Sequence, residues 1–435
     1  MKVCLVALGC EKNVINSEQM LWLMDSEGMQ LVPSPDGADV TVVNTCGFIE
    51  SAKREAIENI LEIAQFSCKI VVAGCMAERH REEIFAELPE VAGLVGCGRF
   101  DDIVQAVRQA ADGERPALFG GLDSPVSETE RILTSPDHTA FIKIADGCDN
   151  RCAYCVIPSL RGAYRSRPME NILAEAESLV QNGARELILI AQDTTRYGTD
   201  LPGGERLLPE LLTSLCAIDG LDWLRIHYLY PDMITEELID VIAREEKICK
   251  YLDIPMQHAS DNILRAMNRR YDGAYLRALI ARLREKIPGL VLRTSLIVGF
   301  PGENEDDFGL LCDFLRDMRL ERAGVFTYSA EEGTAAALMP EQVDEDVKRM
   351  RAERVEMLQS EIMDAFNAAR EGGSLRVLCE GYDRFAEVYF GRSGADSPEV
   401  DGKVFFKSKR KIPAGEMVEV SVTESIDGDL LGEII

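Results

Sequence analysis

Three cysteines near the middle of the chain, Cys148, Cys152 and Cys155, follow the spacing C-x3-C-x2-C. No fourth cysteine and no histidine lies within reach in the same loop. Structural zinc sites are closed by four ligands, and an iron–sulfur cluster that only carries electrons usually takes four thiolates. Three thiolates on one loop instead hold a 4Fe–4S cluster and leave one iron open for a small molecule. The alternatives are a metal loop that borrows a ligand from elsewhere and three free thiols.

Residues 1–110 alternate short apolar runs with amphipathic stretches. The runs at 3–8, 40–43 and 70–73 are rich in β-branched residues and bounded by Gly or Asn, which is typical of strands. Helical patterns cover residues 17–26 and 49–63. Alternation of this kind predicts an α/β unit with a doubly wound parallel sheet.

Three more cysteines end these expected strands: Cys10, Cys46 and Cys75, each beside a glycine that permits close approach of the backbone. The carboxyl ends of parallel strands share one edge of a sheet, where such folds bind ligands. The three thiols are therefore expected to converge on a second metal site. Three buried core cysteines, or a zinc ion completed by His80, are the alternatives. Most of the remaining cysteines are expected in the core, but Cys97 stands between two glycines.

From residue 139 the alternation resumes with roughly six strand and helix pairs, which predicts a partial (β/α)6 barrel. The expected strands are residues 141–144, 187–191, 223–226, 251–254, 291–298 and 323–326. Apolar residues at helical spacing predict one long helix over about 341–370, ended by Gly372 and Gly373. The last residues alternate apolar and polar side chains around turns and predict a small antiparallel β-barrel.

This pattern divides the chain into four segments. Residues 1–111 form the N-terminal domain, and residues 112–137, rich in Gly, Pro, Ser and acids, form a linker. Residues 138–371 form the central domain with its long helix, and residues 372–435 form the small barrel.

The composition indicates in which compartment of the cell the protein is expected. The sequence has 435 residues and no run that approaches the roughly 18 apolar residues of a membrane helix, so no membrane association is expected. Thirteen cysteines without an export signal indicate a cytoplasmic protein whose thiols stay reduced for metal binding or catalysis.

The charge restricts the partners. The net charge is −28, with 11 basic and 22 acidic side chains in residues 1–135 and 8 basic and 12 acidic side chains in residues 372–435. Because nucleic-acid binders neutralise phosphates with cations, no direct nucleic-acid binding is expected. An acidic chain fits a basic protein partner, which it attracts by long-range steering. The alternative is that the acidity only serves solubility.

The two cysteine sets in this order, followed by a small β-barrel, resemble the radical S-adenosylmethionine (SAM) methylthiotransferases along essentially the whole chain. That family combines an N-terminal methylthiotransferase domain, a radical-SAM barrel and a C-terminal TRAM domain. One of its two main branches modifies an adenosine in tRNA. The other, the RimO type, modifies an aspartate in protein twelve of the small ribosomal subunit.

Four motifs favour the ribosomal-protein branch over the tRNA branch. Cys10 is followed by Glu-Lys-Asn, where the tRNA branch usually has Gln-Met-Asn. The other three motifs are QDTTRYG at 192–198, YLDIPMQH at 251–258 and YSAEEGT at 328–334. The chain departs from the family pattern at Asn16, where an aspartate is usual, and this weakens any role for that carboxylate. A tRNA adenosine methylthiotransferase remains the alternative, and a non-catalytic iron–sulfur electron carrier is a more distant one.

The resemblance implies a reaction in which a methylthio group replaces a hydrogen on the β-carbon of an aspartate. It implies two 4Fe–4S clusters and SAM as cofactors. The cluster of Cys148, Cys152 and Cys155 would cleave SAM to a 5′-deoxyadenosyl radical that removes the hydrogen. The cluster of Cys10, Cys46 and Cys75 would hold the sulfur that is methylated and transferred. A basic ribosomal protein is the implied substrate, and the reaction also needs an electron donor and a sulfur donor.

Five further residues are candidate contacts of SAM: Tyr154, Gln192, Asp193, Gly299 and Gly302. Tyr154 precedes the third cysteine of its run, and an ordinary core aromatic is the alternative. Gln192 and Asp193 follow an expected strand on the face where such barrels bind ligands, and turn capping is the alternative. Gly299 and Gly302 either let the backbone approach the adenosine or form a tight turn.

Arg161, Arg165 and Arg167 form a basic island in the acidic chain. They are interpreted either as contacts of the SAM carboxylate or the substrate aspartate, or as a solvated or salt-bridged face. The single histidines His138, His227 and His258 are expected to be structural.

Overall fold

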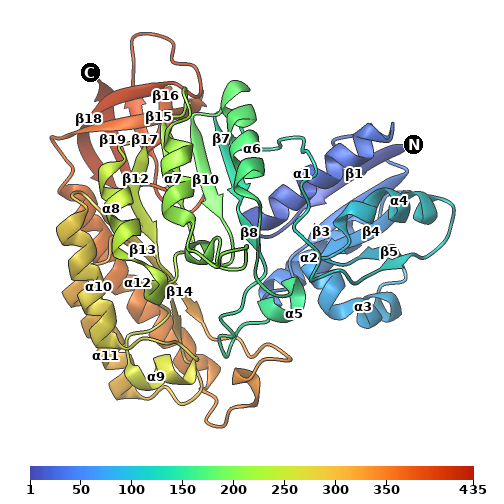
Figure 1. Cartoon of the computed structure of the whole chain (residues 1–435), viewed down its shortest axis with the longest axis horizontal. Coiled ribbons are helices and arrows are strands. Elements are labelled where there is room, and N and C mark those ends of the chain that lie inside the picture. Colours follow the sequence, from blue (N-terminus) through green and yellow to red (C-terminus); the bar gives the residue numbers. More distant parts are fainter.

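The beginning of the chain folds as a six-stranded parallel sheet with the strand order β2-β1-β3-β4-β5-β6. The computed structural model describes all 435 residues, and Figure 1 shows this N-terminal domain beside the rest of the chain. Its strands are β1 (Lys2–Ala7), β2 (Gln30–Leu31), β3 (Val40–Thr45), β4 (Lys69–Gly74), β5 (Val91–Val95) and β6 (Ala117–Leu118). Its helices are α1 (Glu11–Ser26), α2 (Glu50–Ile63), α3 (Cys75–Glu87) and α4 (Ile103–Ala111).

Helices cover both faces of this sheet, which confirms the doubly wound α/β fold. On one face Met20 and Met24 of α1 pack with Val107 of α4 in a cluster of 14 buried apolar residues. On the other face Ile60 of α2 and Ile84 of α3 belong to a cluster of 12. Helix α1 begins at Glu11, six residues before the expected start at residue 17. Its first turns bury polar side chains and so lack the apolar period from which the sequence predicts a helix.

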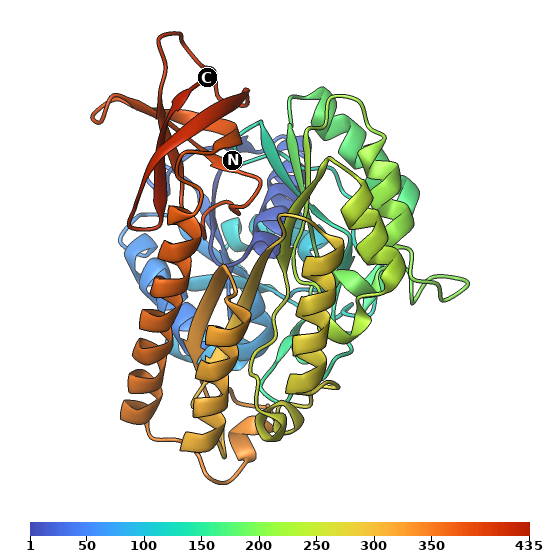
Figure 2. The same ribbon diagram turned by 90° about the vertical axis from the view of Figure 1, so that its left-hand side faces the viewer.

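The central domain is a second six-stranded parallel sheet, with the strand order β14-β13-β12-β11-β10-β7. The strands are β7 (Thr139–Lys143), β10 (Glu186–Ile190), β11 (Trp223–Ile226), β12 (Ile248–Asp253), β13 (Val291–Val298) and β14 (Arg322–Thr327). Its sheet remains open, as a partial barrel does, and helices cover its outer face (Figure 2). The largest core of the protein, 51 buried residues, lies between this sheet and those helices.

The covering helices follow the strands in the expected alternation. The long ones are α6 (Met169–Gln181), α7 (Leu208–Cys216), α8 (Glu236–Arg244), α10 (Gly273–Lys286), α11 (Glu305–Met318) and α12 (Glu345–Ala368). The short elements are α5 (Ile157–Arg161), α9 (Asp261–Ala266), the paired strands β8 (Ala145–Asp146) and β9 (Arg165–Ser166), and 3-10 turns at Phe100–Asp102, Thr194–Arg196, Pro231–Met233 and Ala336–Leu338. None of the helices combines the length and apolar character needed to cross a membrane.

The N-terminal domain packs against the inner face of the central sheet. Successive residues of a strand point to opposite faces. Leu187 and Leu189 of β10 therefore join the core under the helices, while Ile188 and Ile190 meet Ile15 of α1. Helix α1 thus lies where the open barrel exposes its interior.

The chain ends in a closed five-stranded barrel with the strand order β15-β16-β17-β19-β18. Its strands are β15 (Ser374–Asp383), β16 (Val388–Ser393), β17 (Val404–Lys407), β18 (Met417–Ile426) and β19 (Asp429–Ile434). All neighbouring pairs run antiparallel except β17 and β19, which run parallel. Nine buried residues fill the barrel, and α12 leads into it from the central domain.

Candidate functional site

The central triad, Cys148, Cys152 and Cys155, lies in the loop between β8 and α5. Two loop amides, those of Asn150 and Ile157, donate hydrogen bonds to the thiols of Cys148 and Cys155. Burial, together with the neighbouring cysteines, raises the pKa of these two thiols to about 11 and about 12. A loop of this kind requires a cationic group to keep three thiolates together, and the backbone amides supply the hydrogen bonds that iron–sulfur sulfurs accept.

The loop of the central triad is fixed by contacts with distant segments. Arg151 has a left-handed backbone (φ +50°), and its carbonyl accepts a hydrogen bond of 2.8 Å from the Asn268 side chain. The amide of Ala153 donates to the Met267 carbonyl at 3.0 Å. The Cys152 thiol lies 3.9 Å from the Tyr230 hydroxyl. The positions of the three thiols are therefore set by the central domain and not by the loop alone.

The N-terminal triad, Cys10, Cys46 and Cys75, follows strands β1, β3 and β4 at the carboxyl edge of the first sheet. Burial raises the pKa of Cys46 to about 11, and the proximity of Cys75 and Cys10 adds to the rise. This arrangement agrees with the expectation from the sequence that the three cysteines share one edge of the sheet. The thiol of Cys97 lies 3.8 Å from that of Cys75, and together with Arg161 it lowers the pKa of Cys75.

Glycines allow the three loops of the N-terminal triad to approach one another. Gly9 has φ +92°, and a Cβ on it would lie 2.7 Å from the Cβ of Cys46. A Cβ on Gly47 would lie 2.7 Å from the backbone of Met76. A side chain at Gly9 or Gly47 would therefore collide with a neighbouring loop, so both positions require glycine, as the sequence predicts for residues beside these cysteines.

Each triad supplies the three thiols that a cluster with one open iron requires. No three His, Cys, Asp or Glu side chains are arranged to hold one metal ion. His80, the alternative zinc ligand, points its Nδ1 at Glu83 at 3.1 Å and leaves the thiols without a fourth ligand. In a 4Fe–4S cluster each thiolate binds a different iron, so the sulfurs lie farther apart than in a single-ion site. Three thiols on each side fit a cluster with one open iron.

Helix α5 joins the two triads across the interface between the domains. It begins two residues after Cys155, and Val156 and Leu160 pack against Cys75. Arg161, at the end of α5, is 3% exposed and lies 3.5 Å from the Cys75 sulfur. One short segment of chain therefore contacts both triads.

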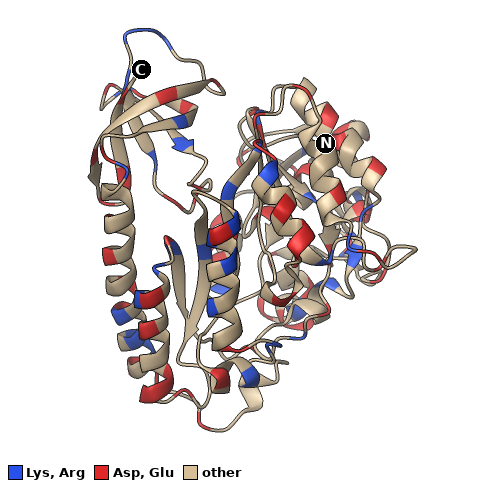
Figure 3. Cartoon of the chain, turned by 60° about the vertical axis from the view of Figure 1, so that its left-hand side comes forward, with Lys and Arg blue, Asp and Glu red and all other residues tan.

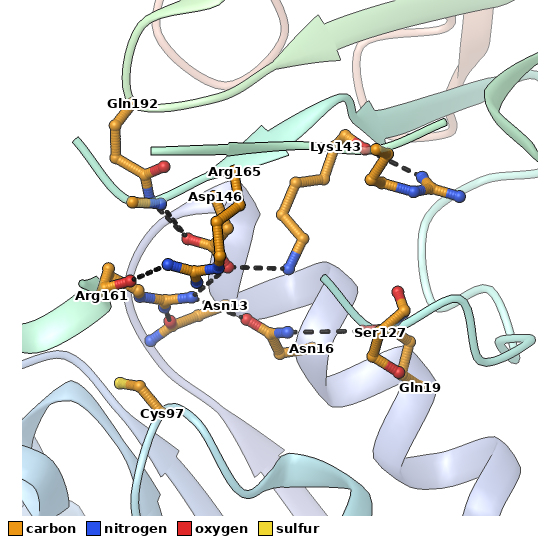
Figure 4. Close-up of polar contacts among 12 residues, drawn as sticks. Asn13, Asn16, Gln19, Cys97, Ser127, Lys143, Asp146, Arg161, Arg165 and Gln192 are labelled. Carbon is orange, nitrogen blue, oxygen red and sulfur yellow. Dashed lines mark hydrogen bonds and ion pairs between the residues drawn. The ribbon is translucent and has the colours of Figure 1, made fainter. Parts of the chain in front are cut away.

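Arg161 is the centre of a buried polar network that Figure 4 shows between α1 and the central domain. Its guanidinium donates to Asn13 Oδ1 at 2.6 Å and to Asn16 Oδ1 at 3.0 Å, and it lies 3.3 Å from Asp146 Oδ2. Lys143 pairs with the same carboxylate at 3.1 Å. Burial alone would raise the pKa of Asp146, but the positive charges of Lys143 and Arg161 outweigh it and lower that pKa. The network fixes the N-terminal domain against the central one.

The basic island is a set of salt bridges and backbone contacts. Arg165 donates to the carbonyls of Arg161 and Ala163. Arg167 pairs with Glu128 and Glu175, each at 2.6 Å. The structure therefore favours the salt-bridged interpretation of these arginines.

Three candidate SAM residues lie close to the central triad and make contacts of their own. Gln192 donates to Asp146 Oδ1 at 3.0 Å, while its buried Oε1 has no partner. Asp193 is fully buried and caps the turn at Thr194–Arg196 by accepting from the Thr195 amide. The Tyr154 hydroxyl accepts from Arg269 at 2.7 Å, and its ring meets the edge of Phe300 with centroids 6.5 Å apart. Gln192 thus keeps a free acceptor, whereas Asp193 is committed to its turn.

The two candidate glycines belong to the turn after β13. Gly299 has φ +73°, and a Cβ on it would lie 2.2 Å from the Cγ of Lys348. Its amide donates to the buried carboxylate of Glu303 at 2.8 Å. Gly302 has φ +82°, and its amide donates to the Glu341 carbonyl at 3.0 Å. Both glycines are needed by the turn itself.

Sequence reasoning missed several residues that the fold brings to the triads. Asp146 and Asn13 form the network around Arg161, and Arg269 holds Tyr154. Lys12 and Tyr228 meet beside Cys10. Lys12 and Asn13 closely follow Cys10 in the motif Cys-Glu-Lys-Asn, and this motif was the sequence signal from which they could have been found. Arg269 and Tyr228 are separated by more than a hundred residues in sequence from Tyr154 and Lys12, which they contact, and Asp146 is 15 residues from Arg161.

Comparisons with known proteins agree with this arrangement. Three family models match the chain: the radical SAM superfamily over residues 142–315, an uncharacterized protein family, UPF0004, over residues 2–96, and the TRAM domain over residues 372–435. The fold and these models define a radical SAM enzyme of three parts.

The relatives specify the family. A protein of Pelotomaculum thermopropionicum is 49% identical, covering 100% of this chain and 99% of its own length. One of Clostridium acetobutylicum is 43% identical, covering 100% and 98%. Both are named ribosomal protein uS12 methylthiotransferase RimO. The chain belongs to the ribosomal protein uS12 methylthiotransferase family.

Solved structures show the same fold at low identity. The radical SAM methyltransferase TsrM of Kitasatospora setae, with cobalamin and a [4Fe-4S] cluster bound, superposes with a TM-score of 0.58 and 15% identity. That match covers 75% of this chain and 74% of TsrM. The cobalamin-dependent radical enzyme OxsB superposes with a TM-score of 0.51 and 13% identity, covering 82% of this chain and 56% of OxsB.

Proposed function

We propose that the chain transfers a methylthio group to the β-carbon of an aspartate in ribosomal protein uS12. The cofactors of this reaction are SAM and two 4Fe–4S clusters, one on each cysteine triad. The domains in this proposal are residues 1–111, 138–371 and 372–435, with a linker at 112–137. The protein acts in the cytoplasm, where its thirteen cysteines stay reduced.

The observation that carries the proposal is the contact of α5 with both triads. Val156 follows the last cysteine of the central triad and packs against Cys75 of the N-terminal triad. A reaction that takes a hydrogen at one site and delivers sulfur from another needs both sites within reach of one substrate atom. An electron carrier needs no such meeting of two open sites.

The side chains of this protein position and enclose the reactants. An unactivated β-carbon gives up no proton to a side-chain base, and SAM bound at a cluster supplies the radical chemistry that removes its hydrogen. Gln192, which donates to Asp146 two residues before Cys148, keeps a buried acceptor without a partner. The Arg161 network keeps the N-terminal triad at a fixed distance from this point. Ile15 of α1 packs on Ile188 and Ile190 of the central sheet and adds an apolar contact to this interface.

The test offers the reconstituted enzyme, SAM and a reductant two substrates in parallel, purified uS12 and tRNA. We expect one aspartate of uS12 to gain a methylthio group in place of a hydrogen, measured by mass spectrometry of its peptides. The tRNA should remain unmodified. Modification of the tRNA with uS12 left unchanged would overturn the proposed substrate.

A second measurement separates the roles of the two triads. Replacing the three cysteines of the N-terminal triad should abolish the modification of uS12 and leave some release of 5′-deoxyadenosine. Replacing the central triad should abolish both. Modified uS12 from the first variant would show that the N-terminal triad does not deliver the sulfur.

A further inference from the structure

Lys12 is a largely buried lysine whose ammonium has no anion within ion-pair distance. It is 7% exposed, and its ammonium forms no ion pair and no hydrogen bond within the chain. Its nitrogen lies 3.2 Å from the centroid of the Tyr228 ring. Enclosing an ammonium without a counter-charge is costly, and a cation–π contact offsets only part of that cost. A binding role would account for a lysine at this position.

The position of Lys12 in its helix adds a second cost. Lys12 is the second residue of α1, in the first turn, where the helix dipole favours negative charge. The neighbouring Glu11 is an acid in the first turn, where the helix dipole stabilises negative charge. Its carboxylate accepts a hydrogen bond from the Tyr228 hydroxyl at 3.0 Å. Neither packing nor helix stability accounts for a lysine here.

The ring beneath Lys12 is held in a strained backbone. Tyr228 has φ +62°, a left-handed conformation that bulky residues rarely adopt. Its carbonyl accepts from the amide and the hydroxyl of Thr194, at 3.1 and 3.2 Å. Strained residues that the surroundings hold in place gather at functional sites.

This pair lies between the two cysteine triads. Lys12 is two residues beyond Cys10, the first member of the N-terminal triad. Tyr230, two residues beyond Tyr228, places its hydroxyl 3.9 Å from the sulfur of Cys152 in the central triad. The segment 228–230 thus spans the space in which a substrate atom meets both triads.

Neither acid near Lys12 forms an ion pair with it. The buried carboxylate of Asp253 is influenced by the charge of Lys12, but its Oδ1 pairs with Arg293 at 3.0 Å and its Oδ2 has no hydrogen-bond partner. Glu11 is held by Tyr228. The positive charge of Lys12 is therefore available to an anion that enters the site.

We propose that Lys12 binds the side-chain carboxylate of the substrate aspartate and so selects aspartate over uncharged residues. This inference rests on the proposed function. The β-carbon is bonded directly to that carboxylate, so a carboxylate held at Lys12 keeps the reacting carbon beside Cys10. No bond forms or breaks at Lys12, which acts as a binding and positioning group.

The experiment measures the affinity of the reconstituted holoenzyme for two short uS12 peptides, one with the target aspartate and one with asparagine in its place. The unmodified protein should bind the aspartate peptide roughly tenfold to a hundredfold more tightly, the range of a charge-assisted hydrogen bond that a neutral amide does not replace. Lys12→Gln should bind both peptides equally. Lys12→Arg should keep most of the preference. Lys286→Gln, an exposed lysine paired with Glu236 and Asp240, should keep all of it.

Two outcomes would overturn the role of Lys12. One is an unmodified enzyme that binds both peptides equally, a result that does not depend on the folding of any variant. The other is a Lys12→Gln protein with normal iron content that still prefers aspartate. Failure of the proposed function has a different signature, because the unmodified enzyme would then not methylthiolate the aspartate peptide at all.

Discussion

Both cysteine triads contain partly buried thiols and backbone amides that donate to sulfur. The amides of Phe48, Asn150 and Ile157 donate to Cys46, Cys148 and Cys155. Burial raises the pKa of these thiols, so the protein without metal holds them protonated at neutral pH. Metal binding must release protons at both sites, and it therefore becomes more favourable as the pH rises.

The first prediction concerns the number of clusters. Anaerobic reconstitution should give about eight irons per chain, and replacing either whole triad by alanine should leave about four, because we propose one four-iron cluster for each triad. Chemical iron analysis of the three proteins checks this. An unmodified protein with only four irons would contradict the second cluster.

The second prediction concerns Gly9, whose missing side chain makes room for Cys46. Gly9→Ala should lower the iron content of the N-terminal triad, because a Cβ there would lie 2.7 Å from that of Cys46. Gly113→Ala is the matched control, since Gly113 also has a left-handed backbone (φ +85°) but nothing within 4 Å. The control should cost about 1 kcal/mol of stability and no iron. Equal iron loss in both variants would assign the effect to backbone strain.

At the scale of elements, α5 and α1 fix the distance between the two triads. Helix α5 is only five residues long, too short to be stable alone, so its position depends on tertiary contacts. Those contacts are the packing of Val156 and Leu160 on Cys75 and the polar network of Arg161 with α1. Loss of the network should therefore loosen the interface before it harms either domain.

The third prediction tests that network. Arg161→Gln should leave Asp146 with Lys143 as its only charged partner and remove the hydrogen bonds to Asn13 and Asn16. Breaking a buried pair costs about 3 to 5 kcal/mol, and we expect faster hydrogen exchange along α1 with the iron of the central triad retained. Arg165→Gln is the control, because Arg165 donates only to backbone carbonyls. Unchanged exchange in α1 would show that packing alone holds the interface.

Periodicity in the sequence was sufficient for elements with a clean apolar pattern. Strand β13 lies at 291–298 as expected, and the long helix is α12 (Glu345–Ala368) within the expected 341–370. Strands β15 and β16 went unrecognised, since glycines and charged residues interrupt their alternation. The early start of α1 was missed because its first turns bury polar side chains that serve the interface. The triads were identified from spacing and strand ends, whereas the Arg161 network depends on a domain contact that no local pattern encodes.

At the scale of the whole molecule, buried ion pairs attach the C-terminal barrel to the central sheet. Glu186 of β10 is fully buried and pairs with Arg392 at 2.6 Å and with Arg225 at 3.0 Å. Arg322 of β14 pairs with Asp396 at 2.7 Å, and the Tyr251 hydroxyl donates to Asp401 at 2.6 Å. These contacts leave the barrel little freedom to rotate.

The fourth prediction is a pH dependence at this junction. Burial alone would raise the pKa of Glu186, but Arg392 and Arg225 outweigh it and lower the pKa to about 2. A lowered pKa in the folded state contributes stability that is complete above the ordinary value of about 4.3 and is lost as the pH falls toward 2. Glu186→Gln should remove this contribution and cost about 3 to 5 kcal/mol at neutral pH, since two arginines lose their counter-charge.

The measurement for Glu186 is urea unfolding between pH 7 and pH 3, followed by the fluorescence of the buried Trp223 near this junction. Glu433→Gln, an exposed acid at the end of the barrel, serves as the control. The unmodified protein and the control should lose stability in parallel as the pH falls. A Glu186→Gln protein with the same acid-induced loss would contradict the assignment.

The charge of the molecule is less uniform than its net value of −28 indicates. Figure 3 shows acidic and basic positions interspersed along the ribbon and a basic loop on the C-terminal barrel. This loop carries Lys407, Lys409, Arg410 and Lys411, all exposed, although residues 372–435 hold 8 basic and 12 acidic side chains. Arg410 is partly neutralised by Glu416. The barrel therefore presents both signs of charge to an approaching partner.

The fifth prediction concerns the attraction of the basic substrate protein. Glu419 and Glu424 are exposed on β18, and reversing both to lysine should slow association with uS12, because steering by surface charge acts on the rate of encounter. Added salt should reduce the difference between variant and unmodified protein, since the Debye length is about 8 Å at physiological ionic strength. Association rates measured by stopped flow at several salt concentrations check both points, and release of 5′-deoxyadenosine should not change. Lys407→Glu with Lys409→Glu is the opposite reversal and should speed association. If both reversals slow it, the basic loop makes a specific contact and net charge is not what draws the substrate.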